Sequence, residues 1–84
     1  MNSRQLQYVL LLSKELNFSQ VAEQLNISQP ALSKQIMALE KELNVKLFDR
    51  SSIPLTLTPA GERFVSDAKE LLFREEQLKR TMED

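Results

Sequence analysis

A run of apolar residues at helical spacing between residues 28 and 43 constrains the fold more than any other feature. The run recurs every three or four residues and consists of Leu32, Ile36, Leu39 and Leu43. Such spacing predicts a helix with one apolar face. The first two turns expose hydrogen-bonding side chains and one cation but no acid, namely Ser28, Gln29, Ser33, Lys34 and Gln35. The acids Glu40 and Glu42 follow only in the second half.

A helix whose N-terminal half is small, polar and free of negative charge can approach a polyanion. Its first residues can then reach base edges in a DNA groove. An ordinary core helix with a solvated outer face would show the same pattern. The neighbouring segments therefore decide between the two interpretations.

The segment before this helix predicts a helix-turn-helix. Asn17 is placed to accept hydrogen bonds from the free amides of a short helix that ends near Leu25. Asn26 tolerates the left-handed conformation that ends a helix. Ser28 then caps the longer helix, and Pro30 fits its first turn. In a helix-turn-helix the short helix braces against the DNA backbone and the long one enters the major groove.

Upstream, residues 3–15 predict a first helix with a wide apolar stripe, and we expect Ser3 to cap it. Downstream, alternating residues on either side of 51–54 predict a small β-hairpin, or wing, in which Pro54 marks an edge strand. Arg50 precedes Ser51 and Ser52, which places a phosphate-binding group beside two hydroxyls. An exposed arginine on a loop is the alternative.

The last segment predicts a long amphipathic helix from Pro59 nearly to Asp84, capped by Thr58. Glu75 interrupts its apolar stripe, which consists of Gly61, Phe64, Val65, Ala68, Leu71, Leu72, Leu78 and Met82. A body of fewer than sixty residues cannot bury so long a stripe. We therefore expect it to pair with a second copy, with a frayed surface helix as the alternative. The predicted division is a domain at 1–58 and a dimerisation helix at 59–84.

Composition excludes several classes of protein. The 84-residue chain has no cysteine and therefore no thiolate metal ligand. It also has no histidine, which is the commonest metal ligand and the commonest general base. We expect neither an enzyme nor a metal or cofactor site. No apolar run is long enough to cross a bilayer, and the first residues do not resemble a signal peptide. A cytoplasmic protein is expected.

The charge is distributed unevenly along the chain. The net charge of −1 argues against a broad basic field. Residues 1–58 carry six bases and five acids, whereas residues 59–84 carry five bases and seven acids. Any contact with DNA must therefore be local and geometric.

Several short stretches of the sequence, in this order, resemble the N-terminal part of a LysR-type transcriptional regulator, and the resemblance covers the whole chain. The matching strings are Leu6–Val9, Asn17–Leu25, Ser28–Ile36, Leu39–Glu40, Leu43, Leu47–Arg50 and Leu57–Gly61. The resemblance implies a mainly α fold: a winged helix-turn-helix of three helices and a hairpin wing, followed by a long linker helix. It also implies a bacterial protein, associated with the nucleoid when bound.

The resemblance further implies binding to double-stranded operator or promoter DNA, at an interrupted inverted repeat. The DNA-binding residues would be Ser28, Gln29, Pro30, Ser33, Lys34, Arg50, Ser51 and Ser52. Among these, Gln29 would contact base edges and Pro30 a thymine methyl group. Ser33 and Lys34 would hold a phosphate or a base edge.

The linker helix would form a homodimer, and a tetramer is the expectation for some full-length members. The dimerisation residues would be Phe64, Val65, Ala68, Leu71, Leu72 and Leu78. A membrane is not an expected partner.

Three departures from the family pattern bear on function. Lys34 stands where arginine is usual and lacks the planar guanidinium fork. The wing at 51–54 carries no arginine for the minor groove. Family members also continue into a much longer effector-binding domain, so we expect an isolated DNA-binding domain that cannot sense a small-molecule effector unless that domain is present. The alternative function is a helical protein–protein module that pairs through its C-terminal helix.

Overall fold

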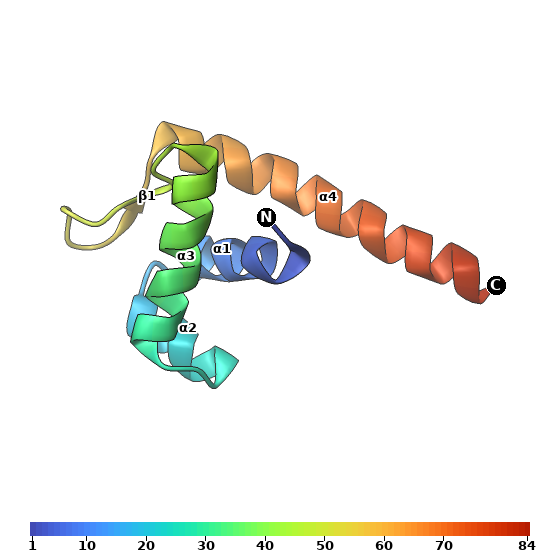
Figure 1. Ribbon diagram of the computed structural model, residues 1–84, viewed down its shortest axis with the longest axis horizontal. Coiled ribbons are helices and arrows are strands. Elements are labelled where there is room, and N and C mark those ends of the chain that lie inside the picture. The colour runs from blue at the N-terminus through green and yellow to red at the C-terminus, as the bar shows by residue number, and fades with distance from the viewer.

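The computed structural model describes residues 1–84 and contains four helices and one two-stranded sheet (Figure 1). The elements follow one another in the order α1 (Ser3–Glu15), α2 (Phe18–Leu25), α3 (Gln29–Leu43), β1 (Phe48–Asp49), β2 (Thr56–Leu57) and α4 (Pro59–Glu83). The predicted mainly α fold, with a helix-turn-helix, a wing and a long last helix, is therefore confirmed. No helix in it combines the length and apolar character needed to cross a bilayer.

Local capping sets most helix boundaries. The side-chain oxygens of Asn17, Ser28 and Thr58 accept hydrogen bonds from the backbone amides three residues on, at 3.0, 3.1 and 2.9 Å. Asn26 and Asn44 adopt the left-handed conformation, with φ of 59° and 54°, and end α2 and α3 as predicted. A polar side chain or a left-handed stop therefore stands at each of these ends.

The start of α1 differs from the prediction. Its cap is Asn2, whose side chain accepts from the amide of Gln5 at 2.8 Å, and Ser3 is already helical. The Ser3 hydroxyl instead donates to the carboxylate of Glu75 on α4. The predicted cap at Ser3 is therefore wrong, because Asn2 caps the helix and Ser3 contacts α4 instead.

The core lies where α1, α2, α3 and the base of the wing meet. Its buried side chains come from all of these elements and are Val9, Leu12, Val21, Ala22, Leu32, Ile36, Leu39, Leu47 and Phe48. The first turns of α4 pack onto this core through Phe64 and Val65. A helix-turn-helix body therefore exists, and the beginning of α4 completes it.

The wing is a short antiparallel hairpin that pairs Phe48 with Leu57 and Asp49 with Thr56. The backbone before the wing packs closely against α4 at Gly61, where an added Cβ would lie 2.0 Å from the carbonyl oxygen of Leu47. Only a residue without a side chain fits so close to another backbone. The sequence pattern had placed Gly61 in the apolar stripe, but its role in the structure is this close approach.

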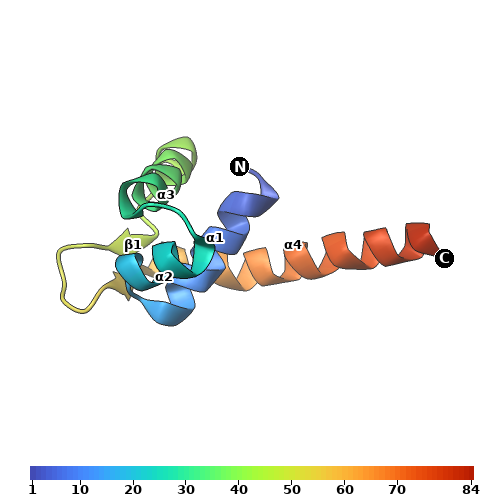
Figure 2. The same ribbon diagram turned by 90° about the horizontal axis from the view of Figure 1, so that it is seen from below.

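The long helix α4 leaves the body and extends well beyond it (Figures 1 and 2). Twenty-five residues span about 37 Å at 1.5 Å per residue, and the molecule measures 46 × 28 × 21 Å. In the C-terminal half of α4, the apolar side chains of Phe73, Leu78 and Met82 are exposed.

Candidate nucleic-acid interface

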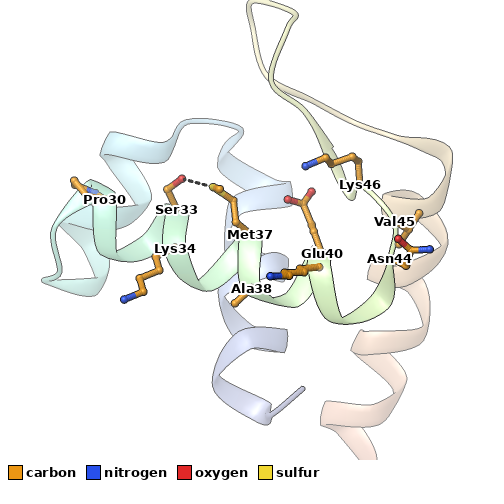
Figure 3. Close-up of a pocket in the computed structure, with 10 residues that line it drawn as sticks. Pro30, Ser33, Lys34, Met37, Ala38, Glu40, Asn44, Val45 and Lys46 are labelled. Atoms are coloured by element: carbon orange, nitrogen blue, oxygen red, sulfur yellow. Dashed lines mark hydrogen bonds between the residues drawn. The ribbon is translucent and has the colours of Figure 1, made fainter.

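The outer face of α3 carries the side chains that the sequence places at the candidate site. Ser28, Gln29, Pro30 and Lys34 are exposed at the N-terminal end of the helix, and Ser33 is half-buried beside them. The cap at Ser28 and the proline in the first turn fix where the helix begins. Figure 3 shows Pro30 and Ser33 on one side of the helix in this view and Lys34 on the other. The structure thus brings the five predicted residues of α3 together.

Gln35 is the exception among the polar residues of the first turns. Its side-chain oxygen accepts a hydrogen bond from the amide of Gln5 on α1, at 3.3 Å. Gln5 is itself buried. Gln35 therefore faces the first helix rather than the outer face of α3.

Arg50 joins the wing to both helices of the helix-turn-helix. Its Nη1 donates to the hydroxyl of Ser33 at 2.7 Å. Its Nη2 lies 3.8 Å from Oε1 of Glu40, and its guanidinium carbon lies 4.6 Å from the centre of the Phe18 ring. The guanidinium therefore contacts α2 and α3 simultaneously. The Ser33 hydroxyl in turn donates a hydrogen bond to Sδ of Met37, at 3.7 Å (Figure 3).

The buried carboxylate of Glu40 is the feature that the sequence pattern missed. Glu40 is 3% exposed. Its Oε2 accepts hydrogen bonds from the backbone amides of Leu47 and Phe48, at 2.7 and 3.3 Å. Its Oε1 makes no hydrogen bond and faces the Arg50 guanidinium. The sequence pattern showed Glu40 only as an acid in the second half of the helix and did not predict its burial, which arises because the chain after α3 folds back over it.

Ser51 and Ser52 use their hydroxyls inside the wing. Ser51 donates its hydroxyl and its backbone amide to Asp49 Oδ1, at 2.5 and 3.0 Å. These bonds stabilise the charged form and hold the pKa of the Asp49 carboxyl below its usual value. The Ser52 hydroxyl lies 3.1 Å from that of Thr56. The predicted cluster of Arg50 with the two hydroxyls does not form, since Arg50 turns toward α3.

The predicted dimerisation residues of α4 divide into two groups. Phe64, Val65 and Ala68 face the protomer's own body: Ala68 is buried and the other two pack on the core. Leu72 is half-buried. Leu71 and Leu78 are 52% and 61% exposed. Only the second half of the stripe, which also includes Met82, therefore remains open.

Comparison with known proteins gives one family. Residues 3–62 match the family described as "Bacterial regulatory helix-turn-helix protein, lysR family". Among curated relatives, the probable cat1 operon transcriptional activator of Acinetobacter lwoffii is 46% identical over 78 residues, which are 93% of this chain and 26% of that protein. The uncharacterized HTH-type transcriptional regulator YkuM of Bacillus subtilis (strain 168) is 36% identical over 84 residues, which are 100% of this chain and 29% of that protein. The chain thus spans little more than a quarter of these relatives.

Solved structures agree with this result. The structure of Vibrio fischeri DarR in complex with DNA superposes with a TM-score of 0.95 at 39% identity, covering 100% of this chain and 29% of that chain. The structure of the BenM_DBD/catB site 1 DNA complex gives a TM-score of 0.94 at 37% identity, covering 99% of this chain and 89% of that chain. Both similar structures contain DNA.

Proposed function

Because the chain belongs to the LysR family of bacterial regulatory helix-turn-helix proteins, we propose that it binds double-stranded DNA in a sequence-specific manner and regulates transcription. The single observation that supports this most strongly is the exposed N-terminal end of α3, where Gln29, Pro30, Ser33 and Lys34 lie together with no acid among them. An α-helix of this kind fits the major groove, which is about 12 Å wide.

Each of these side chains suits one kind of contact. Gln29 has an amide that can bond an adenine edge bidentately, and the exposed ring of Pro30 suits a thymine methyl group. Lys34 supplies a point charge for a backbone phosphate. Ser33 accepts from Arg50 and donates to the Met37 thioether, a weak acceptor that a phosphate or base oxygen would replace. Ser28 lies at the helix N-terminus, where phosphates bind readily.

The wing contributes less in this proposal. Ser51 and Ser52 are tied to Asp49 and Thr56, so their hydroxyls are only partly available to a phosphate. The tip carries Ile53, which is 98% exposed, and no basic side chain. Base recognition is therefore assigned to α3 alone.

The distal half of α4 supports dimerisation through that helix. Leu71, Leu78 and Met82 are 52%, 61% and 72% exposed, and their spacing of seven and four residues puts them on one face. Two copies paired along this face would present two α3 helices to the two halves of an inverted repeat. Residues 1–58 and 59–84 then act as reading body and dimerisation arm, with the first turns of the arm anchored on the body.

Dimerisation is tested with Leu78→Asp, and Gln77→Asp serves as the matched control one residue away. Both positions are exposed beyond the body, so neither variant should change the fold. Sedimentation should show a dimer for the control and a monomer for Leu78→Asp. Equal masses for the two variants would exclude this face as the interface.

Sequence-specific binding is tested by selecting bound duplexes from a random pool at two salt concentrations. The proposal requires enrichment of an inverted repeat with a fixed half-site spacing. A helical protein–protein module was the alternative, and the comparisons do not favour it. It would gain support if no sequence were enriched at either salt concentration.

A further inference from the structure

A groove of about 940 Å³ runs along the outer face of α3 and continues past its C-terminal end. Its lining includes Pro30, Ser33 and Lys34, the residues already assigned to DNA contact. It also includes Lys41 in the last turn and Lys46 just after the helix. The groove thus extends from the assigned contact residues to two further lysines that have no assigned role.

Of the two acids in the second half of α3, Glu40 lines this groove and Glu42 does not. The Glu40 carboxylate is buried, accepts from two backbone amides and faces Arg50. Glu42 lies about 100° around the helix from Lys41 and bonds the terminal amine of Met1 at 2.6 Å. Exposed lysines therefore line the groove from Lys34 in the N-terminal half of α3 to Lys46 beyond its C-terminal end.

The spacing of the lysines matches separate phosphates. Lys34 and Lys41 are seven residues apart, which is about two helical turns and about 10 Å of rise. One DNA strand carries a charge about every 3.4 Å of helix axis, so this distance covers about three steps. Lys41 would therefore reach a different phosphate from Lys34. Asp49 is the acid of the wing, and its Oδ1 accepts hydrogen bonds from the amide and the hydroxyl of Ser51.

We propose that Lys41 and Lys46 bind backbone phosphates of the DNA that α3 enters, so that the contact extends along the whole helix to the base of the wing. The lysines position the duplex and neutralise charge without reading sequence. This inference rests on the proposed DNA-binding function and adds two phosphate contacts per protomer to it. It also explains how a chain with a net charge of −1 can hold DNA.

The test uses the duplex enriched in the selection experiment and measures affinity as a function of salt. Lys41→Ala and Lys46→Ala are compared with Lys34→Ala as a positive reference. The matched control is Lys14→Ala, because exposed Lys14 lines a different cavity between α1, β2 and α4. Each neutralised phosphate contributes about 0.9 to the slope of log K against log salt. Each of the two substitutions should therefore flatten the slope by about two for a dimer, and the control should not.

The outcomes separate the two proposals. Flattened slopes for Lys41→Ala and Lys46→Ala, with unchanged preference for the enriched sequence, support the added phosphate contacts. Wild-type slopes for both variants, with a flattened slope for Lys34→Ala, overturn this inference and leave the DNA-binding function intact. If the wild-type chain shows neither enrichment nor salt dependence, the proposed function and this inference both fall.

Discussion

Removing the buried carboxylate of Glu40 should destabilise the domain more than any other single loss of charge. Its Oε2 is the hydrogen-bond acceptor for the backbone amides of Leu47 and Phe48, and both residues are almost fully buried. Each buried amide left without a partner costs about 1–3 kcal/mol. The half-exposed Arg50 adds little, since solvent screens its charge. We expect Glu40→Ala to lower the free energy of unfolding by about 2–6 kcal/mol, which is the combined cost of the two amides left without a partner.

The loss of stability expected for Glu40→Ala is large relative to the total free energy of unfolding of the domain. An 84-residue domain is stable by about 4–13 kcal/mol at 0.05–0.15 kcal/mol per residue. Glu40→Gln keeps the shape and one acceptor oxygen but loses the charge, so we expect a smaller cost of about 1–2 kcal/mol. The control is Glu42→Ala, which removes an exposed acid two residues further along α3 and should change stability by no more than about 0.5 kcal/mol.

The assay is urea unfolding followed by circular dichroism, at one protein concentration for all variants because the proposed dimerisation would add to apparent stability. A cost below about 1 kcal/mol for Glu40→Ala would refute the assignment. Equal costs for the alanine variants at 40 and 42 would refute it as well.

Three further outcomes are expected. Gly61→Ala should destabilise the domain by about 1–3 kcal/mol in the same urea assay, because the new Cβ would collide with the carbonyl of Leu47; a neutral result would contradict this close approach. The pKa of Asp49, followed by carboxyl NMR shifts, should lie below its usual value and rise in Ser51→Ala. The stability that depends on this carboxylate should be lost only as pH falls through that lowered pKa. Gln29→Ala should relax preference at one base pair of each half-site by on the order of 1–3 kcal/mol in competition binding; an even loss across all sequences would give Gln29 a phosphate role instead.

The sequence predicted the elements well because their boundaries are local. The caps at Asn17, Ser28 and Thr58 and the stops at Asn26 and Asn44 each act within a few residues, so a linear pattern reveals them. The same locality brings the assigned residues of α3 onto one end of a helix. Their grouping at the candidate site therefore followed directly from the predicted helix.

The remaining features depend on contacts between distant segments. The pattern of α3 shows an acid at Glu40, but its burial depends on how residues 45–50 fold back over the helix. Arg50 turns toward Ser33 rather than Ser51 and Ser52, and this choice is made by the position of the wing relative to α3. Neither contact can be predicted from the spacing of apolar and polar residues in the sequence. The two lysines at the far end of the groove were overlooked for the same reason.

The most direct measurement of the interface is an NMR titration of the labelled chain with the enriched duplex. Backbone amide shifts should change along the outer face of α3, from Ser28 through Lys41 to Lys46, and at the base of the wing. The exposed half of α4 should change little once the dimer has formed. Shifts concentrated on α4, with α3 unaffected, would contradict DNA recognition by this helix.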